Sequence, residues 1–448
     1  MLTVMLSFAF KELAPFGGRS IISMDGFSQY YPMLMNMTEA VKNGELFYSF
    51  SGALGFNLWA QNAYYTNSPL WLLVYLVPHS FQAVFIDFIV ILKFALAGLF
   101  FALFLIKTGK EKNHKKRFFL YTALSVAYAL SQYMLAFINQ LMWTDVIVLL
   151  PLVILGLHEL WSKNKISLYA VTLFLSIWSC FYISYMVCLF LCLYFLYLAF
   201  KEKHTLVHII KKGVLFTFSS LASGGMAAVV LLPTVKALSL TMASDMGFSG
   251  GLQIKYTLFE LFRQLLPFQK ISLEYGAPNL YCSVFALVLM TVYFFLKKVP
   301  KRERAVSFLF VLFMFFSMSV NIGEFIWHGF HFPNQLPARQ SFLLIFLVLS
   351  IVCEMESTSS SLLSQVTLTL FDAKTSEILL NERSRFCVIS SSLSSENYPG
   401  IADTKVSSSG LIARLNRTAA CSMIRFKDII DTGIFEAGDR FKMKAWVY

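Results

Sequence analysis

The sequence predicts an all-α polytopic membrane protein, and both its composition and its long apolar segments point to this fold class. Hydrophobic residues make up 57% of the 448 residues, charged residues only 14%, and the mean hydropathy is +0.65. Soluble domains carry about 25% charged residues, so the composition excludes a cytosolic enzyme and a disordered chain. The seven cysteines are scattered without metal-site spacing, and we interpret them as small apolar residues rather than a disulfide framework.

Apolar segments of sufficient length predict the membrane spans. A span needs about 20 apolar residues to cross the hydrocarbon core. Such segments are 82–106, 118–138, 144–161, 213–233, 280–297, 305–323 and 341–356. The segment 166–200 is too long for one span and is predicted to cross twice, with a turn near Ser179–Phe181. Met1–Phe10 rises only about 15 Å as a helix, so we expect either that Leu13–Phe16 completes this first helix or that the sequence starts inside it. Together these segments predict about nine or ten crossings.

Basic residues predict how the chain is oriented in the bilayer. The short connections Lys107–Arg117, Ser162–Lys165, Lys201–Lys212 and Lys297–Arg304 are strongly basic. The connections at the other end, 11–67, 139–145, 234–279 and 324–340, are close to neutral. Short basic loops stay cytoplasmic, so the sequence predicts a multi-pass protein of the bacterial plasma membrane with extracytoplasmic long loops. The net charge of +12 is then a topology signal, and no nucleic-acid partner is predicted.

A boundary is predicted near Glu354, between a transmembrane domain at 1–356 and a tail at 357–448. The tail is polar and rich in serine, and its segment Gln365–Phe371 alternates as a short strand does. We infer no function for the tail.

The connection 11–67 is the predicted functional region, because structured loops of this length are usually functional. Within it, Tyr31–Asn43 has the pattern of a helix lying at the membrane interface. The residues predicted to contact a substrate here are Gln29, Tyr30, Tyr31, Asn57, Tyr64 and Tyr65. For the two adjacent tyrosines, Tyr64 and Tyr65, the alternative is an aromatic belt at headgroup depth.

Asp25 is the predicted catalytic residue. It is flanked by Ile21, Ile22 and Phe27 directly after the first apolar segment. Apolar surroundings disfavour the charged form of a carboxylate, which suits a general base near neutral pH. The alternative is an exposed aspartate that caps a short helix.

Other ionisable residues have two interpretations each. Asp145 follows Trp143 at the predicted outer end of a span, either as a second carboxylate near Asp25 or as the cap of the following helix. Asp87 and Lys93 lie within an apolar segment, where ionisable residues are functional hypotheses. The alternatives are that Lys93 snorkels to the interface and that Asp87 sits at the outer end of its helix.

Two histidines near the predicted last outer loop suggest a further interpretation. His328 and His331, together with Glu324, have the residue types of a metal site. Contact with a donor or acceptor is the alternative. The sequence requires no divalent metal and no cofactor, so none is predicted.

Several short motifs occur in an order that resembles the YfhO family of bacterial membrane proteins. They are Pro15-Phe16-Gly17, Asp25 with Gln29-Tyr30-Tyr31-Pro32, Gly52-Ala53-Leu54-Gly55, Tyr64-Tyr65 with Ser68-Pro69, and Asn139 with Trp143-Thr144-Asp145 and Leu150-Pro151-Leu152. The resemblance covers about residues 11–350. That family in turn resembles the GT-C membrane glycosyltransferases, which have an acidic catalytic residue in their first extracytoplasmic loop.

The resemblance implies a GT-C-like helix bundle that transfers a sugar from a polyprenyl-phosphate donor to a cell-envelope polymer such as teichoic acid. Asp25 would be the general base of an inverting displacement, and Asn139 and Asp145 would join the substrate-binding residues. A leaving phosphate needs a positive partner. Arg339 is the preferred candidate and Arg263 the second; for Arg339 the alternative is an interfacial anchor. The lipid bilayer holds the donor's tail.

Two rival functions stay open at this point. A transporter or flippase of lipid-linked saccharides would show internal repeats and polar residues at the bilayer midplane, of which the sequence has no repeat and few such residues. The other rival is a catalytically inactive family member, because the motifs end near 350 and the polar tail differs from the expected continuation of the family.

Overall fold

The described chain is almost entirely helical, which confirms the predicted all-α polytopic fold class. The structure is a computed structural model, and it describes residues 2–23, 25–51, 55–109, 114–240, 248, 251–273, 275–333 and 335–358. The tail, with its predicted strand at Gln365–Phe371, lies outside the described residues. Up to Thr358 the chain forms one compact unit.

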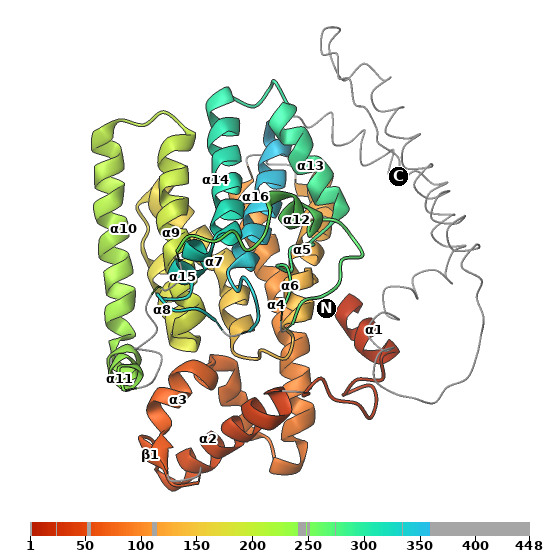
Figure 1. The fold of residues 1–448 in the computed structure, drawn as a ribbon, viewed down its shortest axis with the longest axis vertical. Helices are drawn as coiled ribbons and strands as arrows, with labels where there is room; N and C mark the ends of the chain where they lie inside the picture. Colours follow the sequence, from red (N-terminus) through yellow and green to blue (C-terminus); the bar gives the residue numbers. More distant parts are fainter. Residues whose placement is uncertain are drawn as a thin grey trace, which may run out of the picture. The chain divides into compact units, whose positions relative to one another are not determined.

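Long apolar helices form the bundle and run roughly along its long axis (Figure 1). They are α4 (Gln82–Thr108), α5 (His114–Ala129), α7 (Trp143–Lys163), α8 (Ser167–Ser179), α9 (Phe181–Lys201), α10 (Leu206–Met226), α13 (Val284–Phe295), α14 (Lys301–Ser319) and α16 (Ser341–Thr358). Two shorter helices adjoin them, α6 (Gln132–Ala136) and α11 (Ala228–Leu238), the latter seen end-on in Figure 1. Among the described residues, five helical segments are long and apolar enough to cross a membrane: His79–Thr108, Arg117–Ala136, Trp143–Lys163, Phe181–Lys201 and Leu206–Met226. The predicted spans 82–106, 118–138 and 144–161 therefore coincide with helices.

The apolar segment 166–200 contains two helices, as predicted from its length. Cys180, with an extended backbone (φ −159°, ψ 98°), separates α8 from α9. Gly156 lets α7 and α8 approach closely, because a Cβ at this position would lie 2.5 Å from the backbone nitrogen of Tyr169. The sequence therefore forms a tight helical pair here, packed around the buried α7.

Two predicted helix limits are wrong. The single span predicted at 213–233 is divided at Ala227 into α10 and α11, directly after Gly224 and Gly225, which weaken a helix. The first helix, α1 (Leu2–Phe10), is not extended by Leu13–Phe16, because Pro15 cannot continue a helix and Leu13 instead bridges to Arg19.

The long first connection forms a lower region of short elements beneath the bundle in Figure 1. Its elements are η1 (Gly26–Tyr30), α2 (Tyr31–Asn43), β1 (Tyr48–Ser49), β2 (Phe56–Asn57), α3 (Leu58–Tyr65), η2 (Pro69–Leu76) and η3 (His79–Phe81). The predicted helix at Tyr31–Asn43 is present as α2, which ends at Gly44 in the left-handed conformation (φ 76°). The two strands pair antiparallel, with Tyr48 opposite Asn57.

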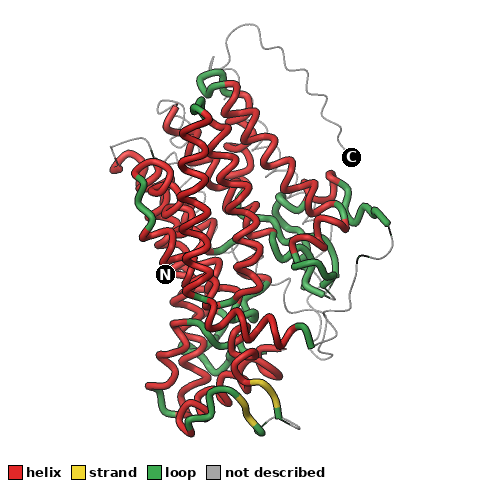
Figure 2. Tube along the Cα trace, turned by 90° about the vertical axis from the view of Figure 1, so that its left-hand side faces the viewer, coloured by secondary structure: helices red, strands yellow, loops and turns green. Residues whose placement is uncertain are grey.

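Two short helices complete the fold outside the set of long helices. These are α12 (Leu258–Arg263) and α15 (Asn321–Trp327). Figure 2, turned by 90°, shows loops gathered beside the long helices and the small strand pair at the lower end. The segment from α15 to α16 returns the chain to the bundle at Ser341.

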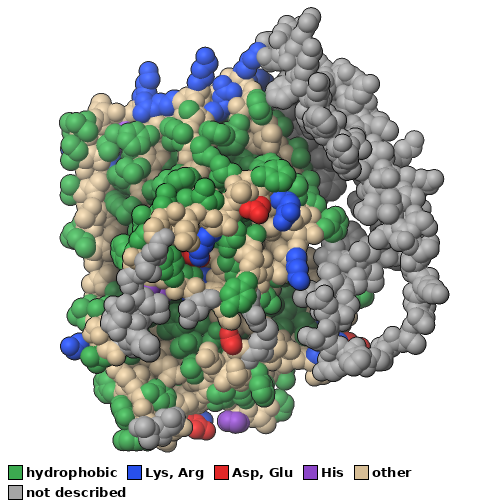
Figure 3. Space-filling model, in the orientation of Figure 1, with side chains coloured by type: hydrophobic (Ala, Val, Ile, Leu, Met, Phe, Trp, Pro, Cys, Tyr) green, Lys and Arg blue, Asp and Glu red, His purple; other side chains and the backbone are tan. Residues whose placement is uncertain are grey.

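Basic side chains gather at the end of the bundle opposite the lower region. Figure 3 shows Lys and Arg along the upper edge, where α13 connects to α14. The C-terminal ends of α4, α7 and α9 also lie at this end of the bundle, where they line one cavity together with the start of α14. The basic connections and the lower region are therefore at opposite ends, as their charge patterns predicted.

Candidate functional site

Asp25 lies directly before η1, at the start of the lower region. Its side chain is exposed and makes no capping hydrogen bond to η1. The predicted apolar enclosure of Asp25 is wrong, because Phe27 is itself 70% exposed and Ile22 is only half-buried. The alternative of a side-chain helix cap is not observed either. The carboxylate is thus open to a reactant.

Asn139 holds the segment around Asp25 against the bundle. Its Nδ2 donates to Ser23 Oγ at 3.0 Å, and its Oδ1 lies 3.7 Å from the place that a Cβ would take at Gly26. Residues on either side of Asp25 are therefore contacted by one side chain from the connection between α6 and α7.

A chain of aromatic rings leads from this segment into the bundle. The Tyr30 hydroxyl donates to Gln140 Oε1 at 2.7 Å, and the rings of Tyr30 and Tyr65 are 5.6 Å apart. Tyr65 packs edge-on against Tyr64 at 4.6 Å, whose hydroxyl accepts a hydrogen bond from Trp143 Nε1 at 3.0 Å. Elements far apart in sequence thereby meet at one place.

Arg339 lies at the inner end of this chain of rings. Its guanidinium is 5.2 Å from the ring of Trp143 and 5.4 Å from the ring of Tyr182. Nη1 donates to the Tyr182 hydroxyl at 2.9 Å, and Nη2 donates to the Gln335 carbonyl at 3.0 Å. The backbone is fixed as well, since the Tyr133 hydroxyl donates to the Arg339 carbonyl at 2.7 Å.

The charges of Asp25 and Arg339 act on the same two tyrosines. Burial raises the pKa of Tyr65, the Asp25 carboxylate raises it further, and the Arg339 guanidinium opposes both. Burial and Asp25 likewise raise the pKa of Tyr30, and Arg339 again lowers it. Both charges therefore act on rings of the same series of contacts. We call this group the aromatic cluster, with the members Asp25, Tyr30, Tyr64, Tyr65, Asn139, Trp143, Tyr182 and Arg339.

Asp145 is buried in the first turn of α7, two residues after Trp143 of the aromatic cluster. Its Oδ2 forms a 2.8 Å ion pair with Lys93 and its Oδ1 accepts from Ser68 at 2.7 Å. Lys93 is fully buried, donates to the Leu141 carbonyl at 2.7 Å and lies 4.3 Å above the Trp71 ring. The predicted snorkelling of Lys93 is therefore wrong. The predicted helix cap is wrong too, since both oxygens of Asp145 bind other partners and the cap position is Met142.

Asp87 has a similar structural role. It is fully buried and lies in the second turn of α4, near the end of this helix that adjoins the lower region, as predicted. Its Oδ1 accepts hydrogen bonds from Ser20 Oγ at 3.0 Å and from the Ile21 backbone at 3.3 Å. It thereby ties the segment that leads to Asp25 onto α4.

Four predicted residues are not brought into the aromatic cluster by any described contact. Asn57 is exposed and caps α3 by accepting from the Ala60 backbone at 3.0 Å. Gln29 is exposed on η1, and Tyr31 is half-buried at the start of α2. Arg263, the second candidate cation, is exposed at the end of α12.

Two members of the site escaped sequence reasoning. Tyr182 directly follows the predicted turn near Ser179–Phe181. This turn and Asp25 were predicted on the same side of the membrane, so the sequence position of Tyr182 could have indicated that it belongs to the site. Gln140 adjoins Asn139, but nothing in the sequence indicates that Tyr30 donates to it.

His328 and His331 flank the aromatic cluster near Tyr182, at ring distances of 6.4 and 6.0 Å. Burial, followed by the charge of Arg339, lowers the pKa of His328 to about 3, so the ring is neutral at physiological pH. Glu324 forms an ion pair with Lys255 instead of facing the histidines. Among the described residues, no group of three or more His, Cys, Asp or Glu is arranged to hold a metal ion.

The segment that carries Arg339 has unusual backbone conformations. Phe330, Leu336 and Ala338 have φ values of 64°, 59° and 48°, in the left-handed region that disfavours side chains. Such conformations cost folding free energy and gather at functional sites. Their position next to Arg339 supports a functional role for this loop.

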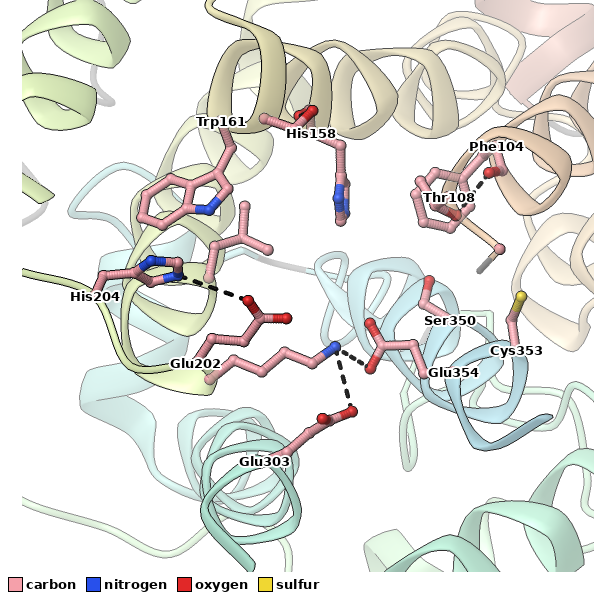
Figure 4. Close-up of a pocket in the computed structure, with 14 residues that line it drawn as sticks. Phe104, Thr108, His158, Trp161, Glu202, His204, Glu303, Ser350, Cys353 and Glu354 are labelled. Carbon is pink, nitrogen blue, oxygen red and sulfur yellow. Dashed lines mark hydrogen bonds and ion pairs between the residues drawn. The ribbon is translucent and has the colours of Figure 1, made fainter. Parts of the chain in front are cut away.

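A second polar group lines a cavity of about 250 Å³ at the basic end of the bundle (Figure 4). Here Lys201 forms ion pairs with Glu303, at 3.7 Å, and with Glu354. The Tyr197 hydroxyl donates to Glu354 at 3.0 Å. His158 projects toward the same space in Figure 4 and bonds to the Tyr194 hydroxyl at 2.9 Å. We interpret this network as a tie between α9, α14 and α16.

Replacing Lys201 with Met is expected to destabilise the fold, because its ion pairs with two glutamates that are 10% and 24% exposed would be lost. The expected loss is about 1–3 kcal/mol, seen as a lower thermal midpoint in detergent. Lys163→Met is the matched control, since its pair with Glu159 is solvent-exposed and worth about 0–1 kcal/mol. Equal midpoints for both variants would contradict the structural role of Lys201.

Comparison with known proteins gives one match. A family model described as the bacterial membrane protein YfhO matches residues 1–374, further in both directions than the motifs at 11–350. No curated protein and no solved structure matches the chain.

Proposed function

The chain belongs to the YfhO family of bacterial membrane proteins, and on this premise we propose that it is a membrane glycosyltransferase. It moves a sugar from a polyprenyl-phosphate donor to a hydroxyl of a cell-envelope polymer, such as teichoic acid. The observation that supports this proposal most directly is the series of contacts that runs from Tyr30 through Tyr65, Tyr64 and Trp143 to the guanidinium of Arg339, and that begins five residues after the exposed carboxylate of Asp25.

The proposed reaction is a single displacement. The Asp25 carboxylate takes the proton of the acceptor hydroxyl, whose oxygen attacks the anomeric carbon of the sugar. The bond between that carbon and the phosphate oxygen breaks, and the polyprenyl phosphate leaves with the electron pair. Arg339 stabilises the negative charge on the departing phosphate. The configuration at the anomeric carbon inverts.

Aromatic rings suit the rest of the substrate. Tyr64 and Tyr65 are half-buried rings, and the buried Trp143 holds the Tyr64 hydroxyl from behind by donating its indole N–H, so the two tyrosines present apolar ring surface with polar groups at its edge. Such a surface favours a sugar ring next to a lipid-linked phosphate. Held between two rings, Arg339 offers a planar donor pattern that fits phosphate oxygens.

The direct experiment offers radiolabelled polyprenyl-phosphate glucose, galactose or N-acetylglucosamine to the purified full chain with an envelope polymer. Label in the polymer supports the proposal. Labelled lipid that crosses the bilayer of a proteoliposome without transfer would favour a flippase instead. Neither transfer nor transport would favour an inactive family member.

The proposal places the aromatic cluster outside the cell, and labelling from the outside tests this. In a cysteine-free background, the Glu45→Cys variant alters an exposed residue of the lower region and the Lys203→Cys variant an exposed residue of a basic connection. A membrane-impermeant maleimide is expected to label the first in intact cells and the second only after permeabilisation, because short basic loops stay cytoplasmic. The reverse pattern would refute the assigned orientation.

A further inference from the structure

Buried polar atoms without a partner gather around Arg339. Among the described residues, no hydrogen bond reaches His328 Nε2, either side-chain end of Gln340, or Ser341 Oγ, although all three residues are fully buried. Asn139 Oδ1, beside Asp25, shares this property. Buried polar groups in folded proteins nearly always have a partner, and leaving one unpaired costs folding free energy.

The hydrogen bonding of His328 defines which partner it lacks. Its Nδ1 lies 2.6 Å from the Glu324 carbonyl oxygen, and a carbonyl only accepts, so Nδ1 carries the proton. In the neutral ring Nε2 is then an acceptor. The missing partner of this nitrogen must therefore be a donor.

The charge of Arg339 and the acceptor character of Nε2 disfavour charged ligands at this nitrogen. Arg339 carries a positive charge that acts on His328, and a cationic ligand would be repelled by it. An anion would offer His328 only acceptor atoms. A neutral hydroxyl or amide N–H fits the nitrogen and tolerates the guanidinium, and a sugar presents several such hydroxyls.

We propose that His328 is a specificity-determining residue, whose Nε2 accepts a hydrogen bond from a hydroxyl of the sugar whose phosphate Arg339 binds. Tyr182 links the two, since it bonds to Arg339 and its ring lies 6.4 Å from that of His328. Gln340 and Ser341 supply further unpaired groups for the same sugar. This inference rests on the proposed function and adds the part of the site that recognises the sugar.

Two substitutions of His328 separate recognition from structure. His328→Asn keeps an amide N–H near the position of Nδ1, for the Glu324 carbonyl, but has no atom where Nε2 stands. His328→Gln reaches the position of Nε2 with an amide oxygen and keeps an acceptor there. His331→Asn is the matched control, since His331 is half-buried beside the same tyrosine.

The probes are citronellyl phosphate and its glucose, galactose and N-acetylglucosamine conjugates, titrated into each full-length protein in detergent. Wild type is expected to bind at least one conjugate more tightly than citronellyl phosphate. The Asn variant should lose about five-fold of this preference, the worth of one hydrogen bond. The Gln variant should keep most of it, and citronellyl phosphate should bind all variants equally.

Several outcomes would overturn the inference. An Asn variant with the wild-type preference shows that His328 does not touch the sugar. Equal weakening of citronellyl phosphate and its conjugates, with a lower thermal midpoint, shows a structural role. A wild type without any preference removes the sugar subsite altogether. Conjugate preference without sugar transfer would instead support the subsite and contradict the proposed function.

Discussion

Replacing Asp25 with Asn is expected to lower sugar transfer by about 10²–10⁴-fold, the usual contribution of a positioned general base. Asn is close in size to Asp but cannot accept the acceptor's proton. The fold should be unaffected, because Asp25 is exposed and makes no capping bond. The measurement is the initial rate of label transfer from the polyprenyl-phosphate sugar at saturating donor.

Glu39→Gln is the matched control for Asp25. Glu39 is an exposed carboxylate on α2, in the same lower region, and its loss should leave the rate unchanged. Undiminished transfer by the Asp25→Asn variant would refute Asp25 as the base while leaving the family and the fold intact. A comparable loss in the Glu39→Gln variant would indicate a general charge effect instead.

Removing Lys93 alone is expected to destabilise the protein by about 3–5 kcal/mol, because it leaves the buried carboxylate of Asp145 without its counter-ion. The side chains of this pair are 0% and 5% exposed. The measurement is equilibrium or thermal unfolding of Lys93→Met in detergent. The double variant Lys93→Met/Asp145→Leu should recover much of the loss, because neither charge remains to be buried.

The double variant also distinguishes a structural role of Asp145 from a catalytic role. Asp145 is a positioning residue, through the Leu141 carbonyl that shares Lys93 with it. A folded double variant should therefore keep measurable transfer, unlike Asp25→Asn. The single variant Asp145→Leu completes the comparison. If the losses of the two single variants simply add in the double variant, the ion pair contributes nothing and its structural role is refuted.

Hydropathy was sufficient to find most of the bundle, because a membrane span is a local property of the chain. The division of 166–200 into two helices followed from its length and from the alternation of basic and neutral connections, and Cys180 marks the break. The predicted helix ends were wrong where glycine or proline, rather than hydropathy, determines where a helix ends. Gly224 and Gly225 precede the division at Ala227, and Pro15 prevents the extension of α1.

The contacts within the aromatic cluster were harder to predict from the sequence, because they join segments that are far apart in the chain. Asp25, Tyr30, Tyr65 and Arg339 were selected by residue type and family resemblance. Described contacts connect Tyr30 and Tyr65 to Arg339 through Tyr64 and Trp143, and the role of Asp25 stays a prediction. The partner of Asp145 was not found. Lys93 was compared with Asp87 on its own helix, whereas its counter-ion lies 52 positions later in the chain.

The bond between Lys93 and Asp145 also has a consequence for how the protein is made. As α4 enters the bilayer during synthesis, an ionised lysine at mid-helix opposes insertion by roughly 2.5–3.5 kcal/mol. The neutralising aspartate emerges from the ribosome only with α7. We therefore expect α4 to remain next to the insertion machinery until α7 arrives, so that the two helices enter the lipid as a pair.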